Sequence, residues 1–269
     1  MPVVLFRNKC YTVCVRKDGG ILDNERFQAA RAAALGRTQG ESGIGTLSEK
    51  ALHAALKAYY EPDTESREIA LGGFVADIVG EEGIIEIQTR GFDRLRAKLD
   101  AFLDAARVTV VYPIVEKRWL RWIDPETGEV SAPKKSPKKW IPFDVFPELY
   151  KIKPQLQHPN FRLRLVLLEL TDYRYLDGYG QKKKIRASRG ERVPEALLGE
   201  INLTCPMDYL RLLPEKLEEP FTTKTLAKAV KRPVAHAQCA VNVLFSRGVL
   251  ERVGREKNAY LYRRKILGE

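Results

Sequence analysis

Two acidic side chains, Asp77 and Glu86, stand on short apolar segments that flank Gly80-Glu81-Glu82-Gly83. Glycine between two β-rich segments is typical of a hairpin turn, and either a two-residue or a four-residue turn places Asp77 opposite Glu86. Directly opposed side chains have Cβ atoms roughly 4.5–5.5 Å apart, and like charges there are destabilising. Because both carboxylates lie among Val, Ala and Ile, we expect a cation to neutralise them. A divalent ion with oxygen ligands, Mg²⁺ above all, fits that role.

The period of two along a strand predicts that Glu86, Gln88 and Arg90 share one face of the second segment. That face would present a carboxylate, an amide and a guanidinium in a row. Two carboxylates that hold Mg²⁺ support phosphodiester hydrolysis, since the ion polarises a phosphoryl oxygen and lowers the pKa of bound water. The alternative is an ordinary solvated face at a sheet edge. The apolar neighbours of Asp77 and Glu86 favour a functional site.

The elements around this pair follow a recognisable order. Apolar residues at helical spacing predict an amphipathic helix from Leu47 that stops before Pro62. Three extended segments follow, then a helix, then a continuous apolar strand. These segments are predicted at residues 67–71, 74–79, 84–90, 92–106 and 108–114. Upstream, residues 2–16 read as a strand or hairpin and residues 25–35 as a helix.

This combination resembles the PD-(D/E)XK superfamily of nucleases, which has the restriction-endonuclease-like fold. Its core has the order α-β-β-β-α-β around a mixed sheet, and a hairpin carries an aspartate and then an acidic-x-lysine triplet. Asp77 matches the aspartate, and Glu86-Ile87-Gln88 matches the triplet. The resemblance implies that Asp77, Glu86 and the backbone carbonyl of Ile87 hold Mg²⁺, with Mn²⁺ as the alternative ion. It also implies that Gln88 positions the attacking water.

Two positions depart from that pattern or have a second explanation. Gln88 stands where the family has lysine, and an amide can orient water but supplies no charge. Arg90, or Lys98 on the following helix, could restore the positive charge. Glu49 lies where the family often has a further carboxylate. It equally completes a capping box that begins at Thr46, and the sequence leaves both roles open.

The last 56 residues have a pattern of their own: a capped helix from Thr222, a second helix over residues 234–246, and a short hairpin. This order resembles a winged helix-turn-helix domain. Val234, Ala237, Val241, Leu244 and Phe245 would form the core stripe of the second helix. The outer surface would then present five candidate nucleic-acid-binding residues: His236, Gln238, Asn242, Arg255 and Lys257. A protein-contact role is the alternative.

Charge divides the chain of 269 residues into three parts. Residues 1–115 contain 15 basic and 16 acidic side chains, residues 116–213 contain 19 and 13, and residues 214–269 contain 12 and 6. We therefore expect an α/β nuclease-like domain over 1–115, a β-rich basic middle region over 116–213 and a winged helix over 214–269. The excess of +11 over the whole chain favours a polyanion partner, and double-stranded DNA is the expected one.

The sequence thus predicts a metal-dependent endonuclease that hydrolyses DNA. The alternative is a non-catalytic DNA-binding regulatory protein with a degenerate nuclease core. Cutting both strands would be easiest for a homodimer.

No apolar run is long enough to cross a membrane, and four cysteines are too few for a disulfide scaffold. A cytoplasmic location is therefore expected.

Overall fold

The computed structural model describes residues 23–38, 50–178 and 187–265. The strand or hairpin predicted at residues 2–16 lies outside these ranges. So do Glu49 and the beginning of the helix predicted from Leu47. These expectations from the sequence therefore lie outside the described residues.

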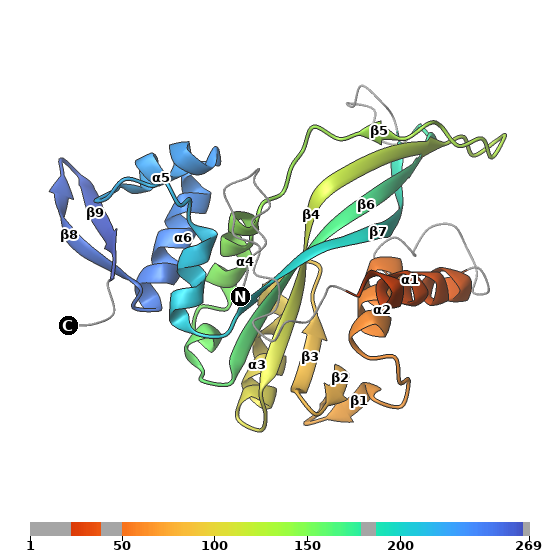
Figure 1. Ribbon diagram of the computed structural model, residues 1–269, viewed down its shortest axis with the longest axis horizontal. Helices are drawn as coiled ribbons and strands as arrows, with labels where there is room; N and C mark the ends of the chain where they lie inside the picture. The colour runs from red at the N-terminus through yellow and green to blue at the C-terminus, as the bar shows by residue number, and fades with distance from the viewer. Residues whose placement is uncertain (1–22, 39–49, 179–186, 266–269) are drawn as a thin grey trace, which may run out of the picture.

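A mixed β-sheet organises the chain (Figure 1). The strands are β1 (Arg67–Leu71), β2 (Phe74–Gly80), β3 (Gly83–Ile87), β4 (Val108–Ile123), β5 (Lys134–Lys135), β6 (Phe161–Tyr175) and β7 (Ser188–Leu203). Their spatial order is β1-β2-β3-β4-β6-β7, with β5 paired to β4. The β3–β4 and β4–β6 pairs are parallel, and the other pairs are antiparallel. The predicted α/β class with a mixed sheet is confirmed.

Helices cover both faces of the sheet, and their apolar side chains form two cores (Figure 1). The helices of this part are α1 (Asn24–Thr38), α2 (Lys50–Tyr60), α3 (Arg96–Leu103) and α4 (Phe146–Lys151), with short 3-10 turns at Phe92–Leu95, Pro142–Val145, Gln155–Gln157 and Pro206–Leu212. On one face, Leu52 and Leu56 of α2 pack with Ile85 and Ile87 of β3. On the other face, Leu99 of α3 packs in a larger cluster. The element order α2-β1-β2-β3-α3-β4 agrees with the predicted order.

Three strands depart from the sequence-based expectation. The strand predicted to end at residue 114 continues to Ile123, because a bulge between Val115 and Lys117 lets β4 pair with β6 over its whole length. Strand β3 ends at Ile87, where a segment up to residue 90 was predicted. Strand β7 was not predicted, because Gly190, Pro194 and Gly199 interrupt its alternation and the register shifts along it.

The C-terminal residues form α5 (Thr223–Val230), α6 (Val234–Ser246) and a hairpin of β8 (Leu250–Glu256) and β9 (Ala259–Arg264). Thr222 caps α5, since its hydroxyl accepts a hydrogen bond from the Thr225 N–H. The predicted core stripe of α6 is wrong at both ends, because Val234 and Phe245 are exposed. Ala240 and Val243 are buried in their place, and they join the larger apolar cluster of the sheet.

Candidate carboxylate site and cleft

The β2–β3 hairpin brings Asp77 and Glu86 together by an unusual pairing of strands. The ladder pairs Gly80 with Gly83 and Ile78 with Ile85, so the predicted register is correct. Beyond Ile78, each carboxylate bonds to the backbone of the opposite strand. Asp77 Oδ2 accepts from the Ile87 N–H at 2.9 Å, and Glu86 Oε1 accepts from the Asp77 N–H at 3.2 Å. The two strands are therefore tied by their acidic side chains rather than by a regular ladder.

Two lysines, one from each face of the sheet, neutralise the carboxylates. Lys57 of α2 places Nζ 3.2 Å from Asp77 Oδ1, and Lys98 of α3 places Nζ 2.5 Å from Glu86 Oε2. The Glu86 side chain is 2% exposed, so its charge is almost fully removed from water. The cation that the sequence required is thus supplied in part by the protein itself.

A histidine completes the contacts of Asp77. His53 of α2 places Nε2 3.2 Å from Asp77 Oδ2. Its position one turn before Lys57 on α2 brings both cations to the same carboxylate. Neither His53 nor Lys57 was predicted from the sequence as a site residue. Their spacing of four residues on one helix face was the only signal for this arrangement.

The surroundings drive the pKa values of the two carboxyl groups apart. Burial alone would raise the pKa of Asp77. The hydrogen bond and proximity of His53, the Ile87 N–H and the charge of Lys57 outweigh it, so that pKa lies well below its usual value. Burial, followed by the negative charge of Asp77, raises the pKa of Glu86, and the contact with Lys98 offsets only part of this rise.

Backbone geometry beside Asp77 is also unusual. Glu68 on β1 has φ of 57°, in the left-handed region that residues with a side chain rarely adopt. Its neighbours Arg67 and Ile69 pair with Ile78 and Ala76, so Glu68 lies across from Asp77. Lys57 Nζ donates to Glu68 Oε1 at 3.0 Å and thereby joins both acidic side chains.

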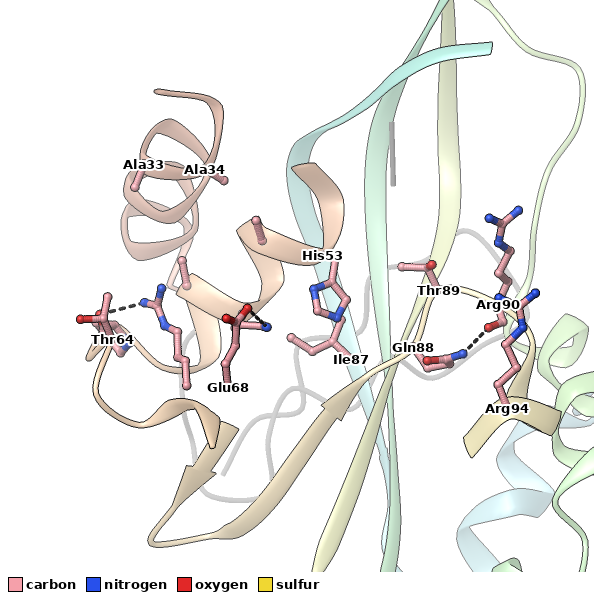
Figure 2. A pocket seen from close by; sticks show the side chains of 15 residues that line it. Ala33, Ala34, His53, Thr64, Glu68, Ile87, Gln88, Thr89, Arg90 and Arg94 are labelled. Atoms are coloured by element: carbon pink, nitrogen blue, oxygen red, sulfur yellow. Dashed lines mark hydrogen bonds and ion pairs between the residues drawn. The ribbon is translucent and has the colours of Figure 1, made fainter. Parts of the chain in front are cut away.

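The structure separates Gln88 and Arg90 from the carboxylates. Because β3 ends at Ile87, these residues do not continue the face of Glu86 as the sequence suggested. The Gln88 side-chain amide donates to the backbone carbonyls of Arg90 and Gly91. Figure 2 shows this amide directed toward Arg90 and away from His53. Of the two cations considered for the missing lysine, Lys98 contacts Glu86, whereas Arg90 lies exposed on the loop.

A cleft of about 830 Å³ opens beside the carboxylate pair. His53 and Lys57, which both contact the partly exposed Asp77, form part of its wall, and Figure 2 shows His53 among the lining side chains. Basic side chains also line it, among them Arg67, Arg90 and Arg94. The cleft can therefore accept an anionic group next to the side chains that contact Asp77, although neither Asp77 nor Glu86 lines it. Among the residues that the structure describes, no group of three or more His, Cys, Asp or Glu side chains is close enough to hold a metal ion.

Comparison with known proteins identifies a family for the part of the chain that carries this site. A model described as "Domain of unknown function (DUF8091)" matches residues 50–204, more than half of the chain. The chain belongs to the DUF8091 family. The DUF8091 match begins at α2 and ends just after β7, so it includes Asp77, Glu86 and both lysines.

A relative of the DUF8091 chain is known from Treponema pallidum (strain Nichols), described as an uncharacterized protein. It is 36% identical over 126 residues, which are 46% of this chain. The match spans about half of the relative's length (50%). No solved structure matches the chain. The α5, α6, β8 and β9 elements follow the region that matches DUF8091.

The candidate nucleic-acid-binding residues of the C-terminal elements lie in two settings. Gln238 and Asn242 are exposed on α6, as are Arg255 and Lys257 on the hairpin. His236 is only half-exposed, since it lines a cleft of about 560 Å³ with Asp144 and Arg232. The prediction that His236 lies on the outer surface is therefore wrong in part. The docking of α6 against the sheet domain turns this side chain toward Asp144, with the two nearest atoms 4.0 Å apart.

An arginine holds the C-terminal elements to the sheet domain. Arg232, at the start of α6, contacts both carboxylate oxygens of Asp144 at 2.5 and 2.7 Å. Such a bidentate pair has a defined geometry.

The described helices include none that is long and apolar enough to cross a membrane.

Proposed function

We propose that this DUF8091 protein is a metal-dependent nuclease that hydrolyses phosphodiester bonds of DNA. The observation that carries the proposal is the pair of adjacent-strand carboxylates, Asp77 and Glu86, beside a cleft with basic walls. Two neighbouring carboxylates that are largely withdrawn from water are unfavourable for folding, and each requires a lysine partner here, so we infer that they are kept for a function. Separated pKa values in one pair are also typical of functional sites.

The donor set is compatible with Mg²⁺, and Mn²⁺ is the alternative ion. Mg²⁺ in nucleotide-processing proteins is usually held by one or two carboxylates, with water and substrate phosphates as further ligands. Asp77 and Glu86 would supply the carboxylates, and the Ile87 carbonyl would be a third protein ligand. When bound, the ion would polarise a phosphoryl oxygen and lower the pKa of water. Lys57 and Lys98 would then be released from part of their present charge pairing.

The remaining residues of the site take roles that follow from their contacts. Lys98 stands 2.5 Å from Glu86 and supplies the positive charge that Gln88 lacks. An ammonium group at that position stabilises negative charge that develops on a phosphate. His53 keeps Asp77 ionised and oriented through the contact at 3.2 Å. Gln88 reaches the water-positioning role only if its amide leaves the carbonyls of Arg90 and Gly91.

The C-terminal elements support DNA as the partner. Their order of two helices and a hairpin is that of a winged helix, with Gln238 and Asn242 exposed on the second helix. Amide side chains on such a helix can pair with adenine in the major groove. Arg255 and Lys257 on the hairpin would contact phosphates.

A second candidate function is a DNA-binding regulatory protein without nuclease activity. The contacts of the site favour it. Lys57 and Lys98 already neutralise the two carboxylates, and the Gln88 amide is hydrogen-bonded to backbone carbonyl oxygen. In that case the acidic pair would be a structural network that fastens α2 and α3 to the hairpin.

Cleavage assays separate the two functions. Supercoiled plasmid and single-stranded DNA are incubated with the full chain and Mg²⁺ or Mn²⁺, and then with EDTA. Asp77→Asn and Glu86→Gln each preserve side-chain shape, and Glu81→Gln in the exposed turn of the same hairpin is the matched control. The nuclease predicts metal-dependent cleavage that both site variants lose by about 100-fold or more and the control retains. Absence of cleavage by the wild-type chain with either ion, while DNA binding persists, would support the regulatory protein.

A further inference from the structure

Strands β4, β6 and β7 form a long ribbon (Figure 1), and a cluster of arginines lies in the second half of β4 and β6 and the first half of β7. Arg118 comes from β4, Arg174 from β6, and Arg189 and Arg192 from β7. A single acidic residue, Asp172, contacts three of them. Arg118 forms an ion pair with Asp172 Oδ2, while Arg174 and Arg192 approach its oxygens at 3.8 and 3.7 Å. Three positive charges thus contact one buried negative charge, and Arg189 lies opposite Arg174 on the neighbouring strand.

The strand register places two arginines of the cluster opposite each other, which is unfavourable without a bound anion. Arg174 pairs directly with Arg189 across the β6–β7 ladder, and like charges in that position are destabilising. Burial, together with repulsion from Arg192, Arg174 and Arg189, lowers the pKa of Arg118 to about 10. The Nε atoms of Arg118 and Arg174 are buried and have no hydrogen-bond partner among the described residues. Arg118 and Arg174 therefore each have a buried Nε without an acceptor among the described residues, and the positive charges that contact Asp172 outnumber its single negative charge.

The cluster lies on the same face of the sheet as α1 and α2. Leu168 and Leu170 of β6 pack in the core formed with these helices, and Asp172 and Arg174 continue the same alternation. Along β4, Val110 pairs with Glu86, and Arg118 lies eight residues further on. At ~3.3 Å per residue, this separates the cluster from the carboxylate site by about 26 Å. One turn of a DNA duplex spans roughly 34 Å, so a single nucleic acid could contact both regions.

We propose that the cluster of Arg118, Arg174, Arg189 and Arg192 binds phosphate groups of a nucleic acid strand that passes over the ribbon. Guanidinium groups match phosphate geometry through paired N–H donors. Arg189 is exposed, and the side chains of Arg174 and Arg192 are about one third exposed, so a strand on the surface can reach them. Phosphates at this position also remove the repulsion between Arg174 and Arg189. The inference shares DNA as the partner with the proposed function, and it requires no hydrolysis.

Two double variants test the proposal in the full chain. Arg174→Gln with Arg189→Gln removes two charges from the cluster and relieves a like-charge pair, so the variant is expected to fold. Lys117→Gln with Arg121→Gln is the control, because Lys117 pairs with Glu169 and Arg121 with Tyr173 on the opposite face of the same ribbon. Both variants have the same net charge. Thermal unfolding of both proteins checks the fold.

Binding to a fluorescent 30-base-pair duplex and to a 30-nucleotide single strand is measured by anisotropy in EDTA, over 50–300 mM salt. The cluster variant is expected to lose about 10-fold or more in affinity, and the slope of log K against log salt should fall by about 2. The control should change affinity by less than about 3-fold. Equal losses in the two variants would reduce the effect to overall charge and overturn the proposal. Unchanged binding in the cluster variant would overturn it as well.

A third arm separates nucleic acid from other anionic partners. Vesicles with 30% phosphatidylserine are tested in the same buffer with the same variants. Cluster-dependent vesicle binding without cluster-dependent DNA binding would overturn the proposal. Because all binding is measured without divalent ions, failure of the cleavage experiment leaves this result unaffected. An Asp77→Asn protein that no longer cleaves but binds DNA normally would separate the two conclusions.

Discussion

Replacing Lys98 with methionine should lower the free energy of unfolding, because the buried carboxylate of Glu86 loses its cationic partner. The substitution keeps most of the side-chain volume of Lys98 but removes the ammonium group 2.5 Å from Glu86 Oε2. Breaking a buried ion pair from one side generally costs about 3–5 kcal/mol. Here the loss of stability is smaller if Glu86 takes up a proton, and its pKa is already raised from 4.5 in the wild-type protein.

Proton uptake by Glu86 limits the loss of stability in Lys98→Met, and this limit depends on pH. Neutralising a carboxyl group with an ordinary pKa near 4.5 costs at most ~3 kcal/mol at pH 7 and under ~1 kcal/mol at pH 5. A pKa that is raised in the folded protein contributes stability below the unfolded pKa and loses it as pH increases. Lys98→Met should therefore be near wild-type stability at pH 5 and lose about 3 kcal/mol at pH 7. For a chain of this size, that loss corresponds to a fall in Tm of roughly 6–12 °C.

Thermal and urea unfolding from pH 5 to 8 measures this prediction. The double variant of Lys98→Met with Glu86→Gln should recover most of the stability and lose its pH dependence. Lys151→Met is the control, because Lys151 forms a more exposed pair with Glu148. It should cost less than about 1 kcal/mol at every pH. A loss in Lys98→Met that is constant with pH, or that the double variant does not relieve, would refute the assignment of a buried charge to Glu86.

Three further perturbations test other parts of the structure. In Asp77→Asn, the stability deficit against wild type should grow from pH 2 to 5 and then level off. The lowered pKa of Asp77 contributes stability that is complete above the unfolded pKa and is lost as the pH falls toward the folded pKa. A difference in the free energy of unfolding that stays constant over this acid range would contradict this. Gly83→Ala should cost more than Gly72→Ala in urea unfolding, because a Cβ at Gly83 would lie 2.4 Å from the Arg107 carbonyl oxygen while Gly72 has open space; both have positive φ, and equal costs would show that the contact is relieved. Thr222→Ala should lower the free energy of unfolding by about 1 kcal/mol, and Thr222→Ser should restore it if the cap of α5 is the cause.

Local sequence patterns predicted the hairpin and its register well. The turn of two glycines and two glutamates fixed the pairing of β2 with β3, since a hairpin register follows from its turn. The same reasoning located α5 through its cap and α6 through its boundaries. It placed Asp77 and Glu86 near each other because their separation lies within one hairpin. Only contacts between residues close in the sequence could be predicted in this way.

Long-range contacts decided which residues complete the site. Lys98 and Lys57 reach the carboxylates because α3 and α2 pack on opposite faces of the sheet, and nothing in the hairpin sequence specifies this. The end of β3 at Ile87 turns Gln88 toward Arg90, against the strict alternation that a strand would give. The divalent ion expected from charge repulsion stays a prediction. The cations that contact the carboxylates are lysines, and their positions depend on the packing of distant elements.

The sequence by itself determined the acidic pair, the basic excess and the order of the elements, because composition, periodicity and turn chemistry are local properties. Only the tertiary structure determined the length of β4 and the pairing of the interrupted strand β7, since a bulge and register shifts are stabilised by the neighbouring strand. It also determined that three arginines from three strands contact Asp172. The physical reason is that charges far apart in the chain become neighbours only when the strands that carry them are hydrogen-bonded side by side.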